Sequence, residues 1–162
     1  VGASGSVIGS DFSEQMLDRA RVKAPQLEWE QANALALPYE ANRFDAVTVG
    51  FGARNFSDLD AGLAEMVRVT RPGGRVVVLE ITTPTKPPLS TFFRLWFDRL
   101  VPLIGRFAGD PDAYSYLPSS VRRFPDARTL AQRLSEAGLD EVGYLLTAGG
   151  IIAIHSGTKP AL

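Results

Sequence analysis

The stretch FDAVTVGFGARN, residues 44–55, joins an apolar, β-branched run to two glycines, a cation and an amide. The continuous apolar run predicts a strand over 44–50 that is covered on both faces. Ligands of open α/β sheets bind beyond the carboxyl ends of the strands, where a glycine lets them approach the backbone. We therefore expect Gly50 to open a crevice into which Arg54 and Asn55 point their donors. The alternative interpretation is a tight strand-to-helix turn that carries a surface arginine.

Strand and helix patterns alternate along the rest of the chain. Apolar segments predict further strands over 7–10, 27–32 and 75–81. Amphipathic patterns with N-cap residues predict helices over 14–24, 59–70 and 126–139. Two closely spaced apolar segments, 141–148 and 150–157, favour an antiparallel pair at a sheet edge. This alternation predicts an α/β fold whose sheet is mostly parallel, with an antiparallel C-terminal edge.

The composition limits the classes of function. The 162 residues suffice for a hydrophobic core, and we expect a single domain over 1–162. A net charge of −1 and the lack of a basic run give no reason to expect nucleic-acid binding. With no cysteine and one histidine, disulfides, thiol catalysis and a metal site are not expected. No apolar run reaches about 18 residues and no signal-peptide pattern is present, so a cytoplasmic protein is the default expectation.

Polar residues at two expected strand ends suit an adenosyl ligand. Asp11 follows the strand at 7–10, where a carboxylate can accept hydrogen bonds from a ribose diol. Nicotinamide enzymes use the same device, and a helix-capping acid is the alternative. Asn33 and Ala34 follow the next apolar segment, where an amide can contact an adenine edge. A simple turn asparagine is the alternative there.

The order of these features resembles one class of enzymes. The strand ending at Asp11, then NALALPY, FDAVTVGFGARNF and MVRVTRPGGRVVVLE, is similar to the series in Rossmann-like S-adenosylmethionine-dependent methyltransferases. Within that class, the details resemble the demethylmenaquinone and 2-polyprenyl-benzoquinol C-methyltransferase family. The stretches that match are FGARNFSD, RVTRPGGRVVVLEITTP, DAYSYLPSSVRRFPD and LTAGGIIAIHSGTKP, and they cover most of residues 7–159. The resemblance implies S-adenosyl-L-methionine as cofactor and C-methylation of a prenylated quinol in menaquinone or ubiquinone biosynthesis.

The resemblance also implies roles for individual residues. The cofactor would be bound by Asp11, Phe12, Asn33, Ala34 and Gly50. The quinol would be bound by Arg54, Asn55, Tyr116 and Arg122. Either of these arginines could stabilise a phenolate. The sequence does not identify the general base. Tyr116 and His155 are the catalytic candidates, although a lone histidine in a terminal strand also suits a structural role.

This sequence departs from the family pattern in three places. Glycine stands at position 50 where the family usually has serine, and alanine at position 53 where it usually has leucine. The family's first strand and glycine-rich cofactor loop have no counterpart before the strand at 7–10. That strand would lie between the strands at 7–10 and 44–50. We therefore expect an N-terminally truncated chain with a gap in its sheet.

The chain changes character after the proline-rich connector at 82–88. We expect a helical insertion on the acceptor side at about 88–125, with an aromatic stripe over 90–107. Such a stripe can pack on the sheet, cover a polyprenyl tail or rest on a membrane surface, so peripheral membrane contact is a hypothesis. A homodimer is a further hypothesis. Three alternative functions stay open: a methyltransferase for another small apolar acceptor, a nicotinamide oxidoreductase, and a non-catalytic fragment or interaction module.

Overall fold

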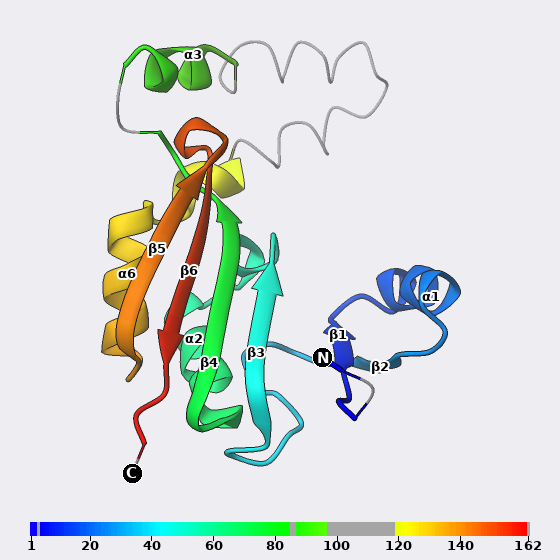
Figure 1. The fold of residues 1–162 in the computed structure, drawn as a ribbon. Coiled ribbons are helices and arrows are strands. Elements are labelled where there is room, and N and C mark those ends of the chain that lie inside the picture. Colours follow the sequence, from blue (N-terminus) through cyan, green and yellow to red (C-terminus); the bar gives the residue numbers. More distant parts are fainter. Residues whose placement is uncertain (3, 85–86, 97–118, 162) are drawn as a thin grey trace.

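The computed structural model describes residues 1–2, 4–84, 87–96 and 119–161, whose strands form two separate sheets (Figure 1). The smaller sheet pairs β1 (Ile8–Asp11) in parallel with β2 (Glu28–Gln31), and α1 (Glu14–Lys23) connects the two strands. Figure 1 shows this unit beside the β3 edge of the larger sheet. Asp11 pairs with Gln31, so both strands end at the same edge. The predicted strands and helix of this region are confirmed.

The larger sheet has four strands in the order β3-β4-β6-β5. These are β3 (Phe44–Gly50), β4 (Thr70–Ile81), β5 (Asp140–Thr147) and β6 (Ile152–Thr158). β3 is parallel to β4, and β6 is antiparallel to both β4 and β5. Three of the four strands therefore run in one direction and only β6 opposes them. The predicted antiparallel pair at the C-terminal edge is confirmed.

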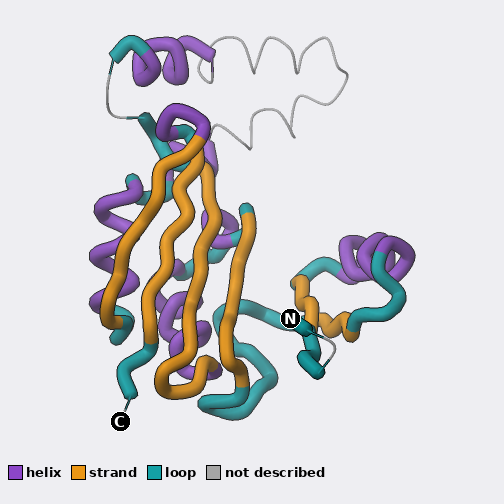
Figure 2. The backbone as a smooth tube through the Cα atoms, in the orientation of Figure 1, coloured by secondary structure: helices purple, strands orange, loops and turns teal. Residues whose placement is uncertain are grey.

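Helices α2 and α6 cover one face of the larger sheet (Figure 2). α2 (Leu59–Val69) follows β3 through the 3-10 turn η1 (Ala53–Asn55), and α6 (Ala127–Glu136) precedes β5. Each helix begins after an aspartate, Asp58 or Asp126, whose side chain accepts a backbone hydrogen bond. Further helical elements are α3 (Leu89–Leu95), the 3-10 turn η3 (Ala148–Gly150) and a helical turn at 119–123. Both predicted capped helices are confirmed.

The hydrophobic core lies between these two helices and β4. Leu63 of α2, Leu134 of α6, and Val76 and Val78 of β4 are fully buried and belong to one cluster. The two valines alternate along the strand, so they face the helices together. The apolar stripes predicted from the sequence are the surfaces that meet here.

The RPGG motif, residues 71–74, forms a bulge at the start of β4. The strand is assigned from Thr70, but its pairing with β3 skips from Thr70 to Arg75. Gly73 takes a left-handed φ of 74° within the bulge. The predicted turn is therefore present, and the strand assignment begins earlier than the predicted 75–81.

The prediction that residues 44–50 are covered on both faces is wrong. β3 forms there, but it is an edge strand of the larger sheet, and Ala46, Thr48 and Gly50 are exposed. The reason is that within the described residues no strand pairs with its second edge, and helices cover only one face. β1 and β3 belong to different sheets, so the strands predicted at 7–10 and 44–50 do not pair with each other, and the expected truncation stays a prediction.

The helical insertion expected at about 88–125 lies largely outside the described residues. Within that range the structure shows α3 and a helical turn at 119–123. The single-domain organisation over 1–162 stays a prediction.

Candidate functional site

The carboxyl end of β3 turns sharply into η1. Phe51 has a left-handed φ of 56°, and its N–H donates to the Leu79 carbonyl of β4 at 2.8 Å. A Cβ added to Gly50 would meet no atom within 4 Å. The backbone of Gly50 is therefore open on this side, and its role in cofactor binding stays a prediction.

A buried ion pair joins this turn to the end of β4. Arg54 Nη1 lies 2.7 Å from Glu80 Oε1 and 2.6 Å from the Phe51 carbonyl oxygen. The side chains of Arg54 and Glu80 are 14% and 1% exposed, so the pair is shielded from water. The sequence analysis did not single out Glu80. The available signal is an acid at the end of the apolar run VVVLE, since a buried charge needs a partner.

All the predicted cofactor-binding residues except Gly50 lie in the smaller unit, at and just beyond the carboxyl ends of β1 and β2. Asp11 is exposed, and its Oδ1 accepts a hydrogen bond from the Ser13 N–H at 2.8 Å at the start of α1. Asn33 Oδ1 accepts from the Leu35 N–H at 3.0 Å, which is a turn-forming contact. Phe12 is 74% exposed. The turn alternative for Asn33 is thus observed, and the cofactor roles stay predictions.

The other predicted site residues are spread over several elements. Asn55 is exposed at the end of η1, and Arg122 is exposed in the helical turn at 119–123. Ala34 is half-buried beyond β2. Tyr116 lies outside the described residues. The predicted cofactor set is therefore divided, because Gly50 belongs to the larger sheet and the other four residues belong to the unit of β1 and β2.

His155 is buried in β6 against α6. Its side chain is 1% exposed, and Nε2 donates to the Ala127 carbonyl oxygen at 2.8 Å. Its ring centroid lies 5.3 Å from that of Tyr144, and within the described part of the chain Nδ1 has no hydrogen-bond partner. These contacts are those of a structural histidine. A catalytic role for His155 stays a prediction.

Acid is expected to destabilise the fold through His155. Burial lowers the pKa of His155, so below about 6.5 the unfolded chain binds a proton that the folded chain excludes. Stability is therefore lost as the pH falls through that value. Between pH 7.5 and 5.5 we expect the parent chain to lose about 1 kcal/mol more than His155→Gln, measured by urea unfolding. Equal losses would contradict this, because all other titrating groups are common to both chains.

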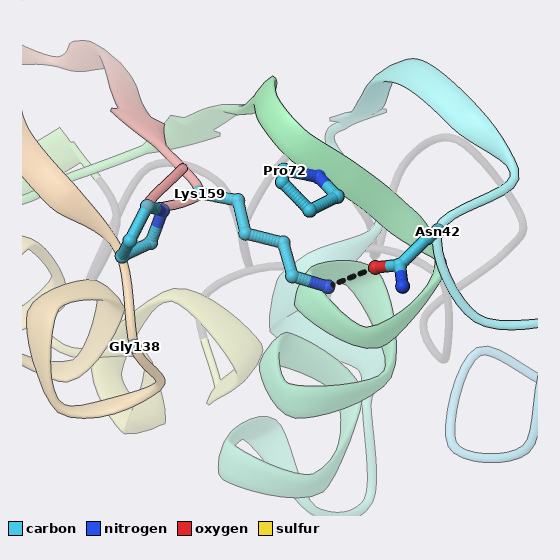
Figure 3. A pocket seen from close by; sticks show the side chains of 5 residues that line it. Asn42, Pro72, Gly138 and Lys159 are labelled. Carbon is cyan, nitrogen blue, oxygen red and sulfur yellow. Dashed lines mark hydrogen bonds between the residues drawn. The ribbon is translucent and has the colours of Figure 1, made fainter. Parts of the chain in front are cut away.

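A pocket lies at the end of the larger sheet that is farther from the Gly50 turn. It is lined by Asn42, Pro72, Gly138, Lys159 and Pro160 (Figure 3). Lys159 Nζ donates to Asn42 Oδ1 at 2.8 Å and to the carbonyls of Thr70 and Val67 at 2.8 and 2.9 Å. These partners stand before β3 and around the start of β4, at the amino ends of both strands. The lysine joins elements of the fold, and the pocket lies away from the Gly50 turn.

Comparisons with known proteins identify a family. Residues 1–159 match the model of the ubiE/COQ5 methyltransferase family. A demethylmenaquinone methyltransferase of Desulfitobacterium hafniense (strain Y51) is 44% identical over 167 residues, covering 99% of this chain and 66% of that protein. A ubiquinone/menaquinone biosynthesis C-methyltransferase UbiE of Francisella tularensis subsp. tularensis (strain WY96-3418) is 41% identical over 166 residues, covering 98% and 66%. The chain spans about two thirds of the length of these curated relatives.

A solved structure shares the fold. The SAM-dependent methyltransferase from Aquifex aeolicus superposes with a TM-score of 0.66 at 17% identity, covering 97% of this chain and 70% of that one. The predicted Rossmann-like α/β methyltransferase fold is confirmed. Among the described helices, none is long and apolar enough to cross a membrane. The resemblance inferred from FGARNFSD and RVTRPGG is confirmed as well, and the chain belongs to the ubiE/COQ5 methyltransferase family.

Proposed function

We propose that this chain catalyses S-adenosylmethionine-dependent C-methylation of a prenylated quinol of the demethylmenaquinol type. The family match over residues 1–159 is the observation that carries the proposal. The names of the relatives, demethylmenaquinone methyltransferase and ubiquinone/menaquinone biosynthesis C-methyltransferase, support a quinol as the acceptor class. The open turn after Gly50 supports a ligand-binding position at the carboxyl end of β3.

The residues present fit an adenosyl cofactor. Asp11 engages only Oδ1 in its hydrogen bond to Ser13, which leaves the second carboxylate oxygen for ribose hydroxyls. Gly50 leaves open the space that a side chain would fill. Asn33, Ala34 and Phe12 would then contact the adenine. When bound, S-adenosylmethionine supplies an electrophilic methyl group on its sulfonium.

Arg54 supplies positive charge on the acceptor side. A ring carbon of a hydroquinone becomes nucleophilic when a hydroxyl loses its proton, and an adjacent guanidinium stabilises the resulting phenolate. Asn55 and Arg122 would contribute further donors. Tyr116 and His155 are the candidate bases, and holding methyl and ring carbon in line supplies the remaining rate enhancement.

We also propose peripheral membrane contact through residues 90–107. The described part of this segment supports it, because Phe92 is 54% and Trp96 40% exposed, with ring centroids 6.1 Å apart. Exposed aromatic rings suit the membrane–water interface. A homodimer remains an additional proposal.

Calorimetric titration of S-adenosylhomocysteine tests the proposed function. We expect saturable binding to this chain and binding weakened at least about tenfold in Asp11→Ala, because the ribose contact is lost. Asp18→Ala is the matched control. This variant removes an exposed acid of α1 that pairs with Arg21 and is not among the proposed cofactor contacts. It should therefore bind S-adenosylhomocysteine like the parent chain.

Two results would weigh against this assignment. Equal binding by Asp11→Ala removes Asp11 from the cofactor site. Absence of binding, both in this chain and in a version extended by the family's upstream strand and glycine-rich loop, contradicts the methyltransferase function. Binding recovered by the extension supports the function and assigns part of the cofactor site to the added segments.

A further inference from the structure

We propose that Glu80 is a positioning residue that fixes the 51–55 turn and presents Arg54 to the acceptor. The inference rests on the proposed function for what Arg54 contacts. How Arg54 is held follows from the contacts of the described residues.

Glu80 gathers three donors at the carboxyl edge of the sheet. Its Oε1 accepts from Arg54 Nη1 at 2.7 Å and from the Ile81 N–H at 2.9 Å. Its Oε2 accepts from the Arg54 N–H at 3.2 Å. With 1% of the side chain exposed, solvent cannot easily replace a donor that is lost. One carboxylate therefore binds both the backbone and the side chain of Arg54.

The same guanidinium holds the shape of the turn. Arg54 Nη1 also donates to the Phe51 carbonyl at 2.6 Å, and Phe51 adopts a left-handed φ of 56°. A bulky residue persists in that conformation only where its surroundings enforce it. Ala53, 1% exposed, packs into the core beneath the turn. Glu80 thus connects the end of β4 to both sides of the turn that follows Gly50.

The guanidinium keeps donors for a ligand. Its hydrogen bonds use only Nη1, and the buried Nε has no partner within the described ranges. Nε is too deeply buried for a ligand oxygen to reach, whereas Nη2 makes no hydrogen bond within the described residues and is not among their buried unpaired atoms. A phenolate oxygen is negatively charged, so it accepts a strong, charge-assisted hydrogen bond from a guanidinium N–H. By fixing Nη1, Glu80 leaves Nη2 for the oxygen of the quinol.

Glu80→Gln tests this role because it keeps the shape of the side chain. The amide loses the charge and replaces one acceptor oxygen by a donor, so it cannot accept both Arg54 bonds. We expect about tenfold faster hydrogen exchange of the Arg54 amide. For methylation of a short-tailed demethylmenaquinol, we expect kcat to fall about tenfold while KM for S-adenosylmethionine stays within about twofold. A general loss of stability would instead raise exchange throughout β4.

Glu65 offers a matched control. It accepts from the Arg68 side chain at 2.6 Å and from the Leu37 N–H at 2.8 Å, the same kinds of partner that Glu80 has. Its ion pair lies on α2, away from the 51–55 turn. Glu65→Gln should speed exchange at Leu37 and leave kcat and the Arg54 amide unchanged.

Each outcome decides the proposal. Unchanged exchange at Arg54 in Glu80→Gln, or the same change in Glu65→Gln, overturns the positioning role. If the parent chain binds no S-adenosylhomocysteine and methylates no quinol, the proposed function fails, and exchange alone decides whether Glu80 holds the turn. If Glu80→Gln does not fold, Arg54→Lys replaces it, since the shorter lysine side chain does not extend to the position from which Nη1 donates to both Glu80 and the Phe51 carbonyl. Faster exchange at Phe51 then supports the role, and unchanged exchange overturns it.

Discussion

Replacing Lys159 by methionine is expected to lower the free energy of unfolding by about 3 kcal/mol. Its Nζ donates to the carbonyls of Val67 and Thr70 at 2.9 and 2.8 Å and to Asn42 Oδ1 at 2.8 Å. The last carbonyls of α2 have no partner within the helix, and the negative end of its dipole favours a cation. Burial lowers the pKa of Lys159, so desolvation offsets part of this gain, and the expected loss stays well below the sum of three charged hydrogen bonds.

Urea unfolding followed by circular dichroism at pH 7 measures this effect. Lys23→Met is the control, because Lys23 lies in the last turn of α1, where the described residues show no hydrogen bond to its ammonium. A change below about 0.5 kcal/mol is expected for that variant. Similar losses in the two variants would contradict the role of Lys159 as the cap of α2.

The helices of the larger unit could be predicted because their signals are local. Apolar residues recur on one face of residues 59–70 and 126–139, and an aspartate stands at the start of each. The antiparallel C-terminal pair follows equally from two apolar segments in close succession. Such patterns determine which face of an element is buried, whatever the distant parts of the chain do.

The errors and omissions concern contacts between distant residues. The apolar run at 44–50 predicts a strand, but whether its second edge is paired depends on other segments. Glu80 and Arg54 are 26 residues apart, and Lys159 is 117 residues from Asn42. No local pattern encodes such pairs. The site residue that the sequence analysis missed, Glu80, is therefore one whose role only the fold reveals.

Replacing Gly74 by alanine is also expected to lower the free energy of unfolding by about 3 kcal/mol. An added Cβ would stand 2.8 Å from the carbonyl oxygens of both Arg71 and Asp45, and 2.7 Å from Thr70 Cγ2. Two of these atoms are backbone, so β3 and the bulge of β4 must move apart. The shift would also disturb the bond from the Lys159 N–H to the Gly74 carbonyl, now 2.9 Å long.

Variants at two further glycines distinguish a backbone clash from the cost of a left-handed φ and from the general effect of replacing glycine by alanine. At Gly73 an added Cβ meets no atom within 4 Å, but its φ of 74° is left-handed, so Gly73→Ala should cost about 1 kcal/mol. Gly143 in β5 also has open space and no left-handed φ, so Gly143→Ala should be neutral or slightly stabilising, by less than about 0.5 kcal/mol. Urea midpoints of the three variants give the order directly. Equal losses would exclude the backbone clash as the reason for glycine at position 74.

The predicted order bears on how the RPGG signature is interpreted. If Gly74→Ala is the most damaging of the three, the motif acts through the close approach of β3 and β4 at their amino ends. The amino ends of these strands lie at the opposite end of the sheet from the turn after Gly50. The RPGG motif then indicates the fold, and its residues take no part in binding or catalysis. The case for methyl transfer to a quinol must then rest on the other edge, where Gly50, Arg54 and Glu80 meet.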